Sequence, residues 1–302
     1  MADGLRLPMA DCHDDLQMGV VHQQERGQAD PFGDFWLPQL REGGVILQVL
    51  PIYTEEQFLG EGALRRALRF VETAWSIADQ HAADVAVVTT AAELDETLAS
   101  GRIALVLAFE GMEPVAHDVA LIDSFWRLGV RMASLTWNRR TMFADGLGES
   151  ATGGGLTTLG LAAVERMEAL GMIVDVSHLA DAGFEHVARV ARKPFVASHS
   201  SCRVVYGHPR NLTDEMLRTI AEADGFACLN AYGGFVGGDG PSVADYVEHV
   251  AHAVDVIGAQ RVGLGLDFVA DIFEQLDPIV GGVLLGPDQL GTISGLERPA
   301  DL

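Results

Sequence analysis

The chain has 302 residues, 48% of them hydrophobic and 21% charged, so it can bury a large core and is neither a disordered tail nor a disulfide-stapled miniprotein. Forty-three acidic residues against 20 Lys and Arg give a net charge of −23, which repels phosphate backbones and anionic headgroups and disfavours nucleic-acid and membrane-surface functions. Three widely spaced cysteines, Cys12, Cys202 and Cys228, support neither a disulfide framework nor a cysteine-ligated zinc site.

The N-terminal segment has one basic residue and no apolar run of signal-peptide length before its acidic cluster. No stretch reaches the roughly 18 consecutive apolar residues of a membrane span, and the longest runs, such as 103–109, have the length of a strand. We therefore expect a soluble, cytoplasmic protein.

Short apolar runs alternate along the chain with longer segments of helical period. The runs are mostly apolar on both faces, as in parallel strands that are covered on either side, and lie at 7–12, 44–52, 103–109, 130–136, 172–177, 194–198, 225–230 and 261–266. The helical segments between them lie at 62–81, 92–100, 118–128, 157–170, 181–192, 213–223 and 242–257. Thr213 and Ser242 have the pattern of helix N-caps, each with an acid in the first turn.

Eight strand–helix alternations without a Pro/Gly/Ser-rich linker favour one (β/α)8 TIM barrel domain over residues 1–302. An open doubly wound sheet is the alternative, but the G-x-G-x-x-G turn typical of such sheets is missing after the first strand. The segment after the eighth strand is rich in Gly, Pro and Asp and shows no clear helix, so we expect the final helix of the barrel to be missing.

Active sites of such barrels lie where the strands end, and polar residues gather at these positions. The residues that follow the first, third, fifth, sixth and eighth predicted strands are His13 and Asp15, Glu110, His178, His199, and Asp267. Each would cost several kcal/mol unpaired in a packed barrel layer. Together they make sense as metal ligands.

Each of these residues, taken alone, also has a plain structural explanation. His13 and Asp15 fit a capped turn, Glu110 a helix-capping acid, and His178 and His199 hydrogen-bonded core histidines. Their joint occurrence favours chemistry, because imidazole and carboxylate ligands suit zinc or a similar divalent ion, and a shared carboxylate suits two ions. Asp175, inside the fifth strand, is expected to be structural.

The successive motifs resemble the membrane (renal-type) dipeptidase family of the amidohydrolase superfamily. The stretches that carry the resemblance, in order from about residue 9 to residue 269, are Asp11-Cys-His-Asp-Asp-Leu, Phe109-Glu-Gly, Leu135-Thr-Trp-Asn, Gly171-Met-Ile-Val-Asp-Val-Ser-His, Ala197-Ser-His-Ser-Ser, Pro209-Arg-Asn-Leu-Thr-Asp and Gly263-Leu-Gly-Leu-Asp-Phe. The two histidine-containing motifs of the middle and the Pro-Arg-Asn-Leu-Thr-Asp stretch are the most specific.

The resemblance implies a zinc-dependent dipeptidase with two divalent ions. By this likeness His13 and Asp15 bind one zinc, and His178 and His199 bind the other. Glu110 would bridge the two ions. The likeness also makes Asp267 the acid/base, and it makes Arg210 and Tyr232 contacts of the substrate, with Arg210 on its terminal carboxylate. The expected partner is a dipeptide, including ones with a D-configured second residue, with a homodimer as an open option for the assembly.

Trp137 is a departure from the family pattern, because many members have a histidine there that touches the scissile carbonyl or its oxyanion. We still expect Trp137 to contact the substrate, but its indole offers one N–H donor and cannot titrate, so the substrate preference stays open. Two other functions also stay open. One is a different binuclear amidohydrolase acting on a lactam, an N-acyl amino acid or a deaminated base, and the other is a non-catalytic barrel without metal.

Overall fold

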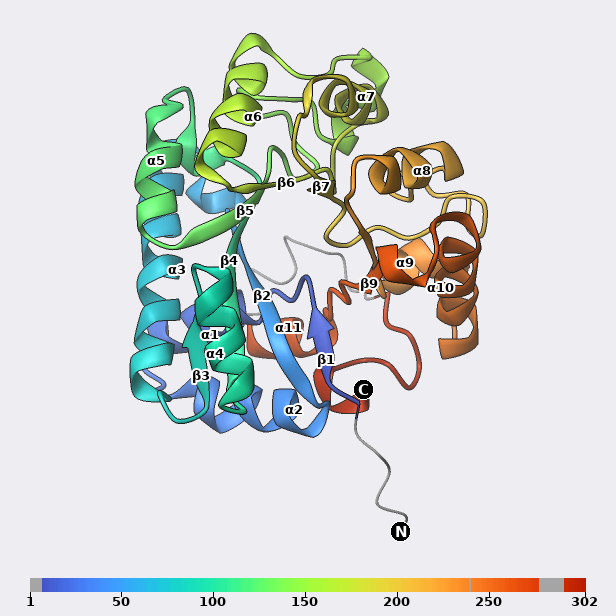
Figure 1. The fold of residues 1–302 in the computed structure, drawn as a ribbon. Helices are drawn as coiled ribbons and strands as arrows, with labels where there is room; N and C mark the ends of the chain where they lie inside the picture. The colour runs from blue at the N-terminus through green and yellow to red at the C-terminus, as the bar shows by residue number, and fades with distance from the viewer. Residues whose placement is uncertain (1–6, 239, 277–290) are drawn as a thin grey trace.

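Eight parallel strands form a ring around a central axis, with helices on the outside (Figure 1). The computed structural model describes residues 7–238, 240–276 and 291–302. The strands of the ring are β1 (Met9–Asp11), β2 (Val45–Tyr53), β4 (Ile103–Glu110), β5 (Val130–Ser134), β6 (Ile173–Asp175), β7 (Phe195–Val196), β8 (Ala227–Leu229) and β9 (Val262–Leu264). Their spatial order is β7-β6-β5-β4-β2-β1-β9-β8, and a parallel bridge between Ala197 and Ala227 brings the two ends together.

The (β/α)8 barrel predicted from the sequence is therefore confirmed, and the open doubly wound sheet is wrong. Each of the eight predicted runs overlaps one strand of the ring. The sequence analysis did not predict strand β3 (Val85–Val87). It pairs with the first residues of β4, and β5 pairs with the same edge of β4 from Leu107 onward.

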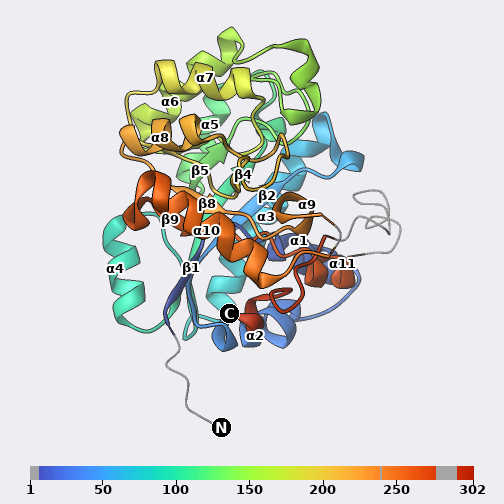
Figure 2. The ribbon, with the colours of Figure 1, turned by 90° about the vertical axis from the view of Figure 1, so that its right-hand side faces the viewer.

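Helices cover the outside of the ring, and Figure 2 shows α10 lying in front of β8 and β9. Their bounds are α1 Leu16–Glu25, α2 Leu37–Glu42, α3 Glu61–Gln80, α4 Ala91–Ala99, α5 Ala120–Arg127, α6 Thr158–Leu170, α7 Asp181–Val190, α8 Asp214–Glu222, α9 Gly233–Val236, α10 Val243–Ile257 and α11 Ala270–Gln275. Thr213 and Ser242 cap α8 and α10 as predicted, accepting hydrogen bonds from the amides of Met216 and Asp245.

The sequence analysis did not predict four of the helices, namely α1 and the short helices α2, α9 and α11. Helix α1 lacks a polar face, because every residue from Leu16 to His22 is buried, and a helix buried all round has no amphipathic period to detect. The sequence showed no clear helix after the last strand, but the six-residue helix α11 follows β9 and packs against α1. The adjoining part of the predicted helix-free segment, 277–290, lies outside the described residues.

Apolar side chains fill the ring, so it is a packed core and not a pore. Val49, Ala108, Met132 and Val196 from four strands form a small buried cluster inside it, and Cys12 packs against them. A larger core lies between the strands and the helices. Cys202 and Cys228 are buried free thiols, as expected of core residues.

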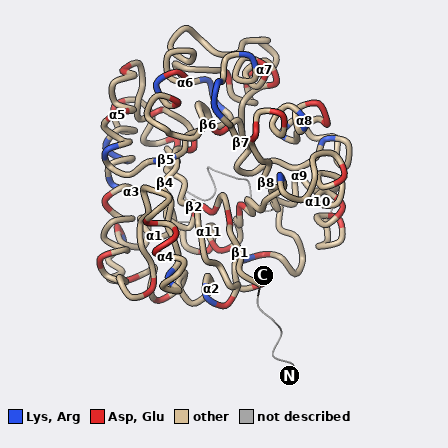
Figure 3. The backbone as a smooth tube through the Cα atoms, in the orientation of Figure 1, with Lys and Arg blue, Asp and Glu red and all other residues tan. Residues whose placement is uncertain are grey.

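The charged residues are distributed as the net charge of the sequence leads one to expect. Acidic residues are spread over helices on all sides of the barrel, with fewer basic ones between them (Figure 3). Within the described ranges, every helix is too short or too polar to cross a bilayer.

Gly265 lets the end of β9 approach the end of β7. A Cβ atom at this position would overlap the carbonyl oxygen of Ser198, beside His199. We expect Gly265→Ala to lower the free energy of unfolding by about 2 kcal/mol or more, because the backbone has no room to yield. Thermal and denaturant unfolding measure this loss.

Gly62→Ala is the matched control, because a Cβ atom there meets only the Cβ atom of Phe58 at 3.7 Å, an ordinary contact. It should leave the unfolding free energy unchanged or slightly higher. Equal stability of the two variants would contradict the close approach.

Candidate metal centre

The predicted ligands lie together at the carboxyl end of the ring. Glu110 is the last residue of β4, and His13 and Asp15 follow β1. His178 and His199 each stand three residues beyond their strands, β6 and β7. Parallel strands in a barrel end at the same mouth, so residues distant in sequence meet there.

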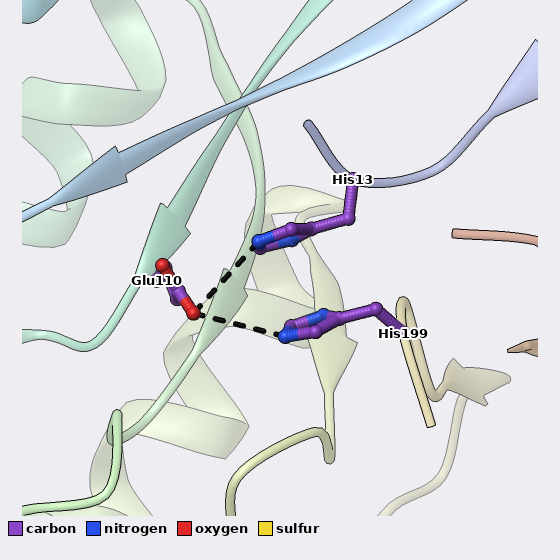
Figure 4. Close-up of side chains that lie close together, drawn as sticks. All are labelled: His13, Glu110 and His199. Atoms are coloured by element: carbon purple, nitrogen blue, oxygen red, sulfur yellow. Dashed lines mark ion pairs between the residues drawn. The ribbon is translucent and has the colours of Figure 1, made fainter. Parts of the chain in front are cut away.

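One oxygen of Glu110 is the centre of the group. Its Oε1 atom lies 2.9 Å from Nε2 of His178, 3.7 Å from Nε2 of His199 and 3.8 Å from Nε2 of His13. Figure 4 shows the rings of His13 and His199 side by side, both with Nε2 towards this oxygen. Their ring centroids are 3.6 Å apart.

His13 also belongs to a second group of potential ligands. One atom each of His13, Asp15 and Asp267 lie within 4.8 Å of one another, and Nε2 of His13 is 3.9 Å from Oδ2 of Asp15. Asp267 sits beyond β9, where its amide donates to the carbonyl of His13 and its Oδ2 accepts from Asn230 at 2.8 Å. The geometry thus brings all six predicted strand-end residues into one cluster.

Hydrogen bonding within the cluster is incomplete in a way that fits a metal. Nε2 of His13 and Oδ1 of Asp15 are buried and find no hydrogen-bond partner among the described residues. Nδ1 of His178 donates a hydrogen bond to Oδ1 of Asn138 at 2.9 Å. In the neutral imidazole this places the proton on Nδ1 and leaves Nε2 with a lone pair. That atom faces Nε2 of His199 at only 2.8 Å and Glu110 at 2.9 Å. Two ring nitrogens this close need either a proton or a metal cation between them, and the surrounding ligand set suits a metal.

Burial and neighbouring charges shift the pKa values of the cluster. Burial lowers the pKa of His178 and His199 well below the usual value, and nearby cationic groups lower it further. Burial and the charge of Asp15 raise the pKa of Glu110 well above its ordinary value. Burial alone would lower the pKa of His13, but Glu110 and Asp15 raise it to about 10. The imidazole and carboxylate donors themselves are of the types that divalent cations such as zinc bind.

Two of the candidate residues hold a strained backbone. His178 has φ = 70° and Asp267 has φ = 55°, in the left-handed region that non-glycine residues rarely adopt. Such a conformation costs on the order of 1–3 kcal/mol and is characteristic of functional sites. In this backbone conformation the side chains of His178 and Asp267 both lie at the mouth of the barrel.

A cavity of about 670 Å³ opens over the cluster. Trp137 and Tyr232, predicted to contact substrate, both line it, together with Asp15, Glu110, His178 and Asp267. Tyr53, which sequence reasoning missed, packs edge-on against Trp137 at a centroid distance of 5.2 Å. The aromatic pair forms an apolar wall beside the ligand cluster.

Arg210 is buried beside His199 and is not among the residues that line this cavity. It is 4% exposed, and its guanidinium donates to the carbonyl of His199 at 2.7 Å and to Oγ of Ser200 at 2.5 Å. Its Nε finds no acceptor within the part of the chain that the structure describes. Burial lowers the pKa of Arg210 to about 10, against the attraction of Asp267.

Three polar residues surround the ligands; the sequence analysis gave no role to Asn138 and Ser198 and expected Asp175 to be structural. Asn138 holds His178, Ser198 contacts His199, and Asp175 binds Ser198. The signal for Asn138 and Ser198 was present, since both stand inside the quoted motifs, but their contacts depend on how the loops fold.

Known proteins resemble this chain over most of its length. The membrane dipeptidase family (peptidase family M19) matches residues 5–277. Dipeptidase verJ from Clonostachys rogersoniana is 31% identical over 207 residues, which cover 68% of this chain and 53% of that protein. The chain thus matches about half the length of this relative.

Solved structures agree with the sequence match. A metallo peptidase from Rhodobacter sphaeroides, liganded with a phosphinate mimic of the dipeptide L-Ala-D-Ala, has a TM-score of 0.85 and 26% identity, over 98% of this chain and 90% of that one. Dipeptidase AC, of family M19, has a TM-score of 0.83 with the same identity and coverage. Since the family match extends over residues 5–277, the chain belongs to the membrane dipeptidase family, peptidase family M19.

Proposed function

We propose that the protein is a binuclear metallo-dipeptidase that hydrolyses dipeptides with a free C-terminal carboxylate. The observation that carries the proposal is the meeting of three imidazole Nε2 atoms within 3.8 Å of one carboxylate oxygen of Glu110. Family membership supports the activity. The Rhodobacter structure with its L-Ala-D-Ala mimic supports substrates with a D-configured second residue.

In this proposal His13 and Asp15 hold one ion, His178 and His199 hold the other, and Glu110 is shared between them. Zinc is the proposed metal, because histidine and carboxylate ligands suit it. Ions of this kind polarise a carbonyl group and lower the pKa of water towards neutrality.

Asp267 is the proposed acid/base. It is close to His13 and Asp15, and Asn230 orients one of its oxygens. Burial raises its pKa, so a proton taken up by this carboxyl group stays available for the leaving amine. The side chain thus serves first as a general base and then as a general acid.

Arg210 is the proposed determinant of the free carboxylate. The positive charge of Arg210 and its Nε–H group, which has no acceptor among the described residues, are available to bind a carboxylate. Its other two nitrogens donate hydrogen bonds to Ser200 and to the carbonyl of His199. Trp137 and Tyr232 are the proposed walls for the substrate side chains.

Metal content tests the ligand assignment. The purified protein should hold two divalent ions per chain, and His199→Ala should lose mainly one of them, since it removes one of the two nitrogen ligands of that ion. His252→Ala is the control, because His252 pairs with Asp214 on the surface. Full metal content in His199→Ala, measured by elemental analysis, would contradict the assignment.

Asp267→Asn tests the acid/base. A positioned proton donor contributes about 10²- to 10⁴-fold to the rate, so kcat should fall at least about a hundredfold while metal content and melting temperature stay near those of the wild type. A carboxylate that only caps the barrel would give the reverse pattern, with lower stability and unchanged kcat. Steady-state kinetics and thermal unfolding of the metal-replete variant distinguish the acid/base role from the structural one.

A panel of substrates tests the activity and separates it from other amidohydrolase reactions. Dipeptides should be cleaved with a kcat/KM about 10- to 100-fold above that of their C-terminal amides. This ratio corresponds to the loss of one hydrogen bond to a charged carboxylate. Arg210→Lys should reduce this ratio. Turnover of lactams or N-acyl amino acids without turnover of any dipeptide would contradict the proposal.

A further inference from the structure

The carboxylate of Asp175 connects the two loops that carry His178 and His199. Asp175 ends β6 and is 3% exposed. Its Oδ1 accepts hydrogen bonds from the amides of Ser177 at 3.0 Å and Ser198 at 2.9 Å, the residues directly before the two histidines. Its Oδ2 accepts from Oγ of Ser198 at 2.5 Å. Every contact that the structure gives this carboxylate is one in which it accepts.

These contacts determine where the proton of His199 lies. A serine hydroxyl has one hydrogen, and that of Ser198 is donated to Asp175. Oγ of Ser198 also lies 2.7 Å from Nδ1 of His199, so in this second contact the serine oxygen must accept and Nδ1 must donate. A neutral imidazole with its proton on Nδ1 has a lone pair on Nε2, the atom that faces Glu110 at 3.7 Å.

We propose that Asp175 and Ser198 are positioning residues that hold His199 in the tautomer able to bind metal through Nε2. This inference rests on the proposed metal centre but concerns a chain of hydrogen bonds present without metal. It replaces the expectation that Asp175 is only structural. Hydrogen bonds that orient a histidine ligand typically change metal affinity by about 10- to 100-fold.

Asp175→Asn is the sharpest variant, because it preserves shape. The Asn oxygen can keep the two backbone amides, while its NH2 group replaces Oδ2 and donates to Ser198. The serine hydrogen is then free to turn to Nδ1 of His199, which moves the imidazole proton to Nε2. Ser198→Ala removes the acceptor for Nδ1 altogether, and Ser198→Thr restores a hydroxyl.

Ser201→Ala is the matched control. Ser201 is buried in the same loop and donates to the carbonyl of Asn230 at 2.7 Å, without a contact to a histidine ring. It removes one buried serine hydrogen bond but leaves the hydrogen-bond chain of His199 intact.

The experiment measures two quantities on the full chain. Nitrogen-15 NMR of the metal-free protein reports the tautomer of each histidine, with His199 assigned by substitution, and titration against a chelator gives the Kd for Zn²⁺. We expect the Nδ1–H form of His199 in the wild type, Ser201→Ala and Ser198→Thr, and a larger Nε2–H population in Asp175→Asn and Ser198→Ala, with the Zn²⁺ Kd raised 10- to 100-fold in these two.

The outcomes separate this inference from the proposed function. An Nε2–H form of His199 in the metal-free wild type, a reading that needs no variant to fold, overturns the inference. Unchanged tautomer and Zn²⁺ affinity in Asp175→Asn, with only a lower melting temperature, overturn it as well. A wild type with the Nδ1–H form that binds no Zn²⁺ contradicts the metal centre instead and leaves the hydrogen-bond chain standing.

Discussion

The crowding of three buried imidazole nitrogens around one carboxylate oxygen is the constraint on which the rest of the site depends. Oε1 of Glu110 has three imidazole nitrogens within 3.8 Å, and two of them, on His178 and His199, are 2.8 Å apart. Because neighbouring groups occupy the Nδ1 positions of both rings, their Nε2 atoms face one another as acceptors. Such an arrangement is repulsive by itself, and the proposed pair of divalent cations would relieve it.

The fold maintains this arrangement through short strands with polar ends. Strands β1, β4, β6 and β7 deliver the ligands to one mouth, and the apolar cluster of Val49, Ala108, Met132 and Val196 closes the ring beneath them. Hydrogen bonds between the loops, above all those of Asp175, then set the ring orientations. The site therefore depends on loop-to-loop bonds as much as on the barrel.

Much of this was predictable from the sequence, because strand runs and the polar residues after them are local patterns. The eight strands and the six strand-end residues from His13 to Asp267 follow from this reasoning. Helix α1 did not, because its residues are buried all round. The contact of Asp175 with Ser198 joins residues 23 apart, and that of Asn138 with His178 joins residues 40 apart, so no local pattern encodes them. The burial of Arg210 against His199 and Ser200 was likewise a result of packing.

The most direct test of the account is a crystal structure of the zinc-loaded protein with anomalous scattering measured on both sides of the zinc edge. The account predicts two peaks, one held by His13 and Asp15 and the other by His178 and His199, with Glu110 between them as a ligand of both. A single ion, or ions bound away from Glu110, would contradict it.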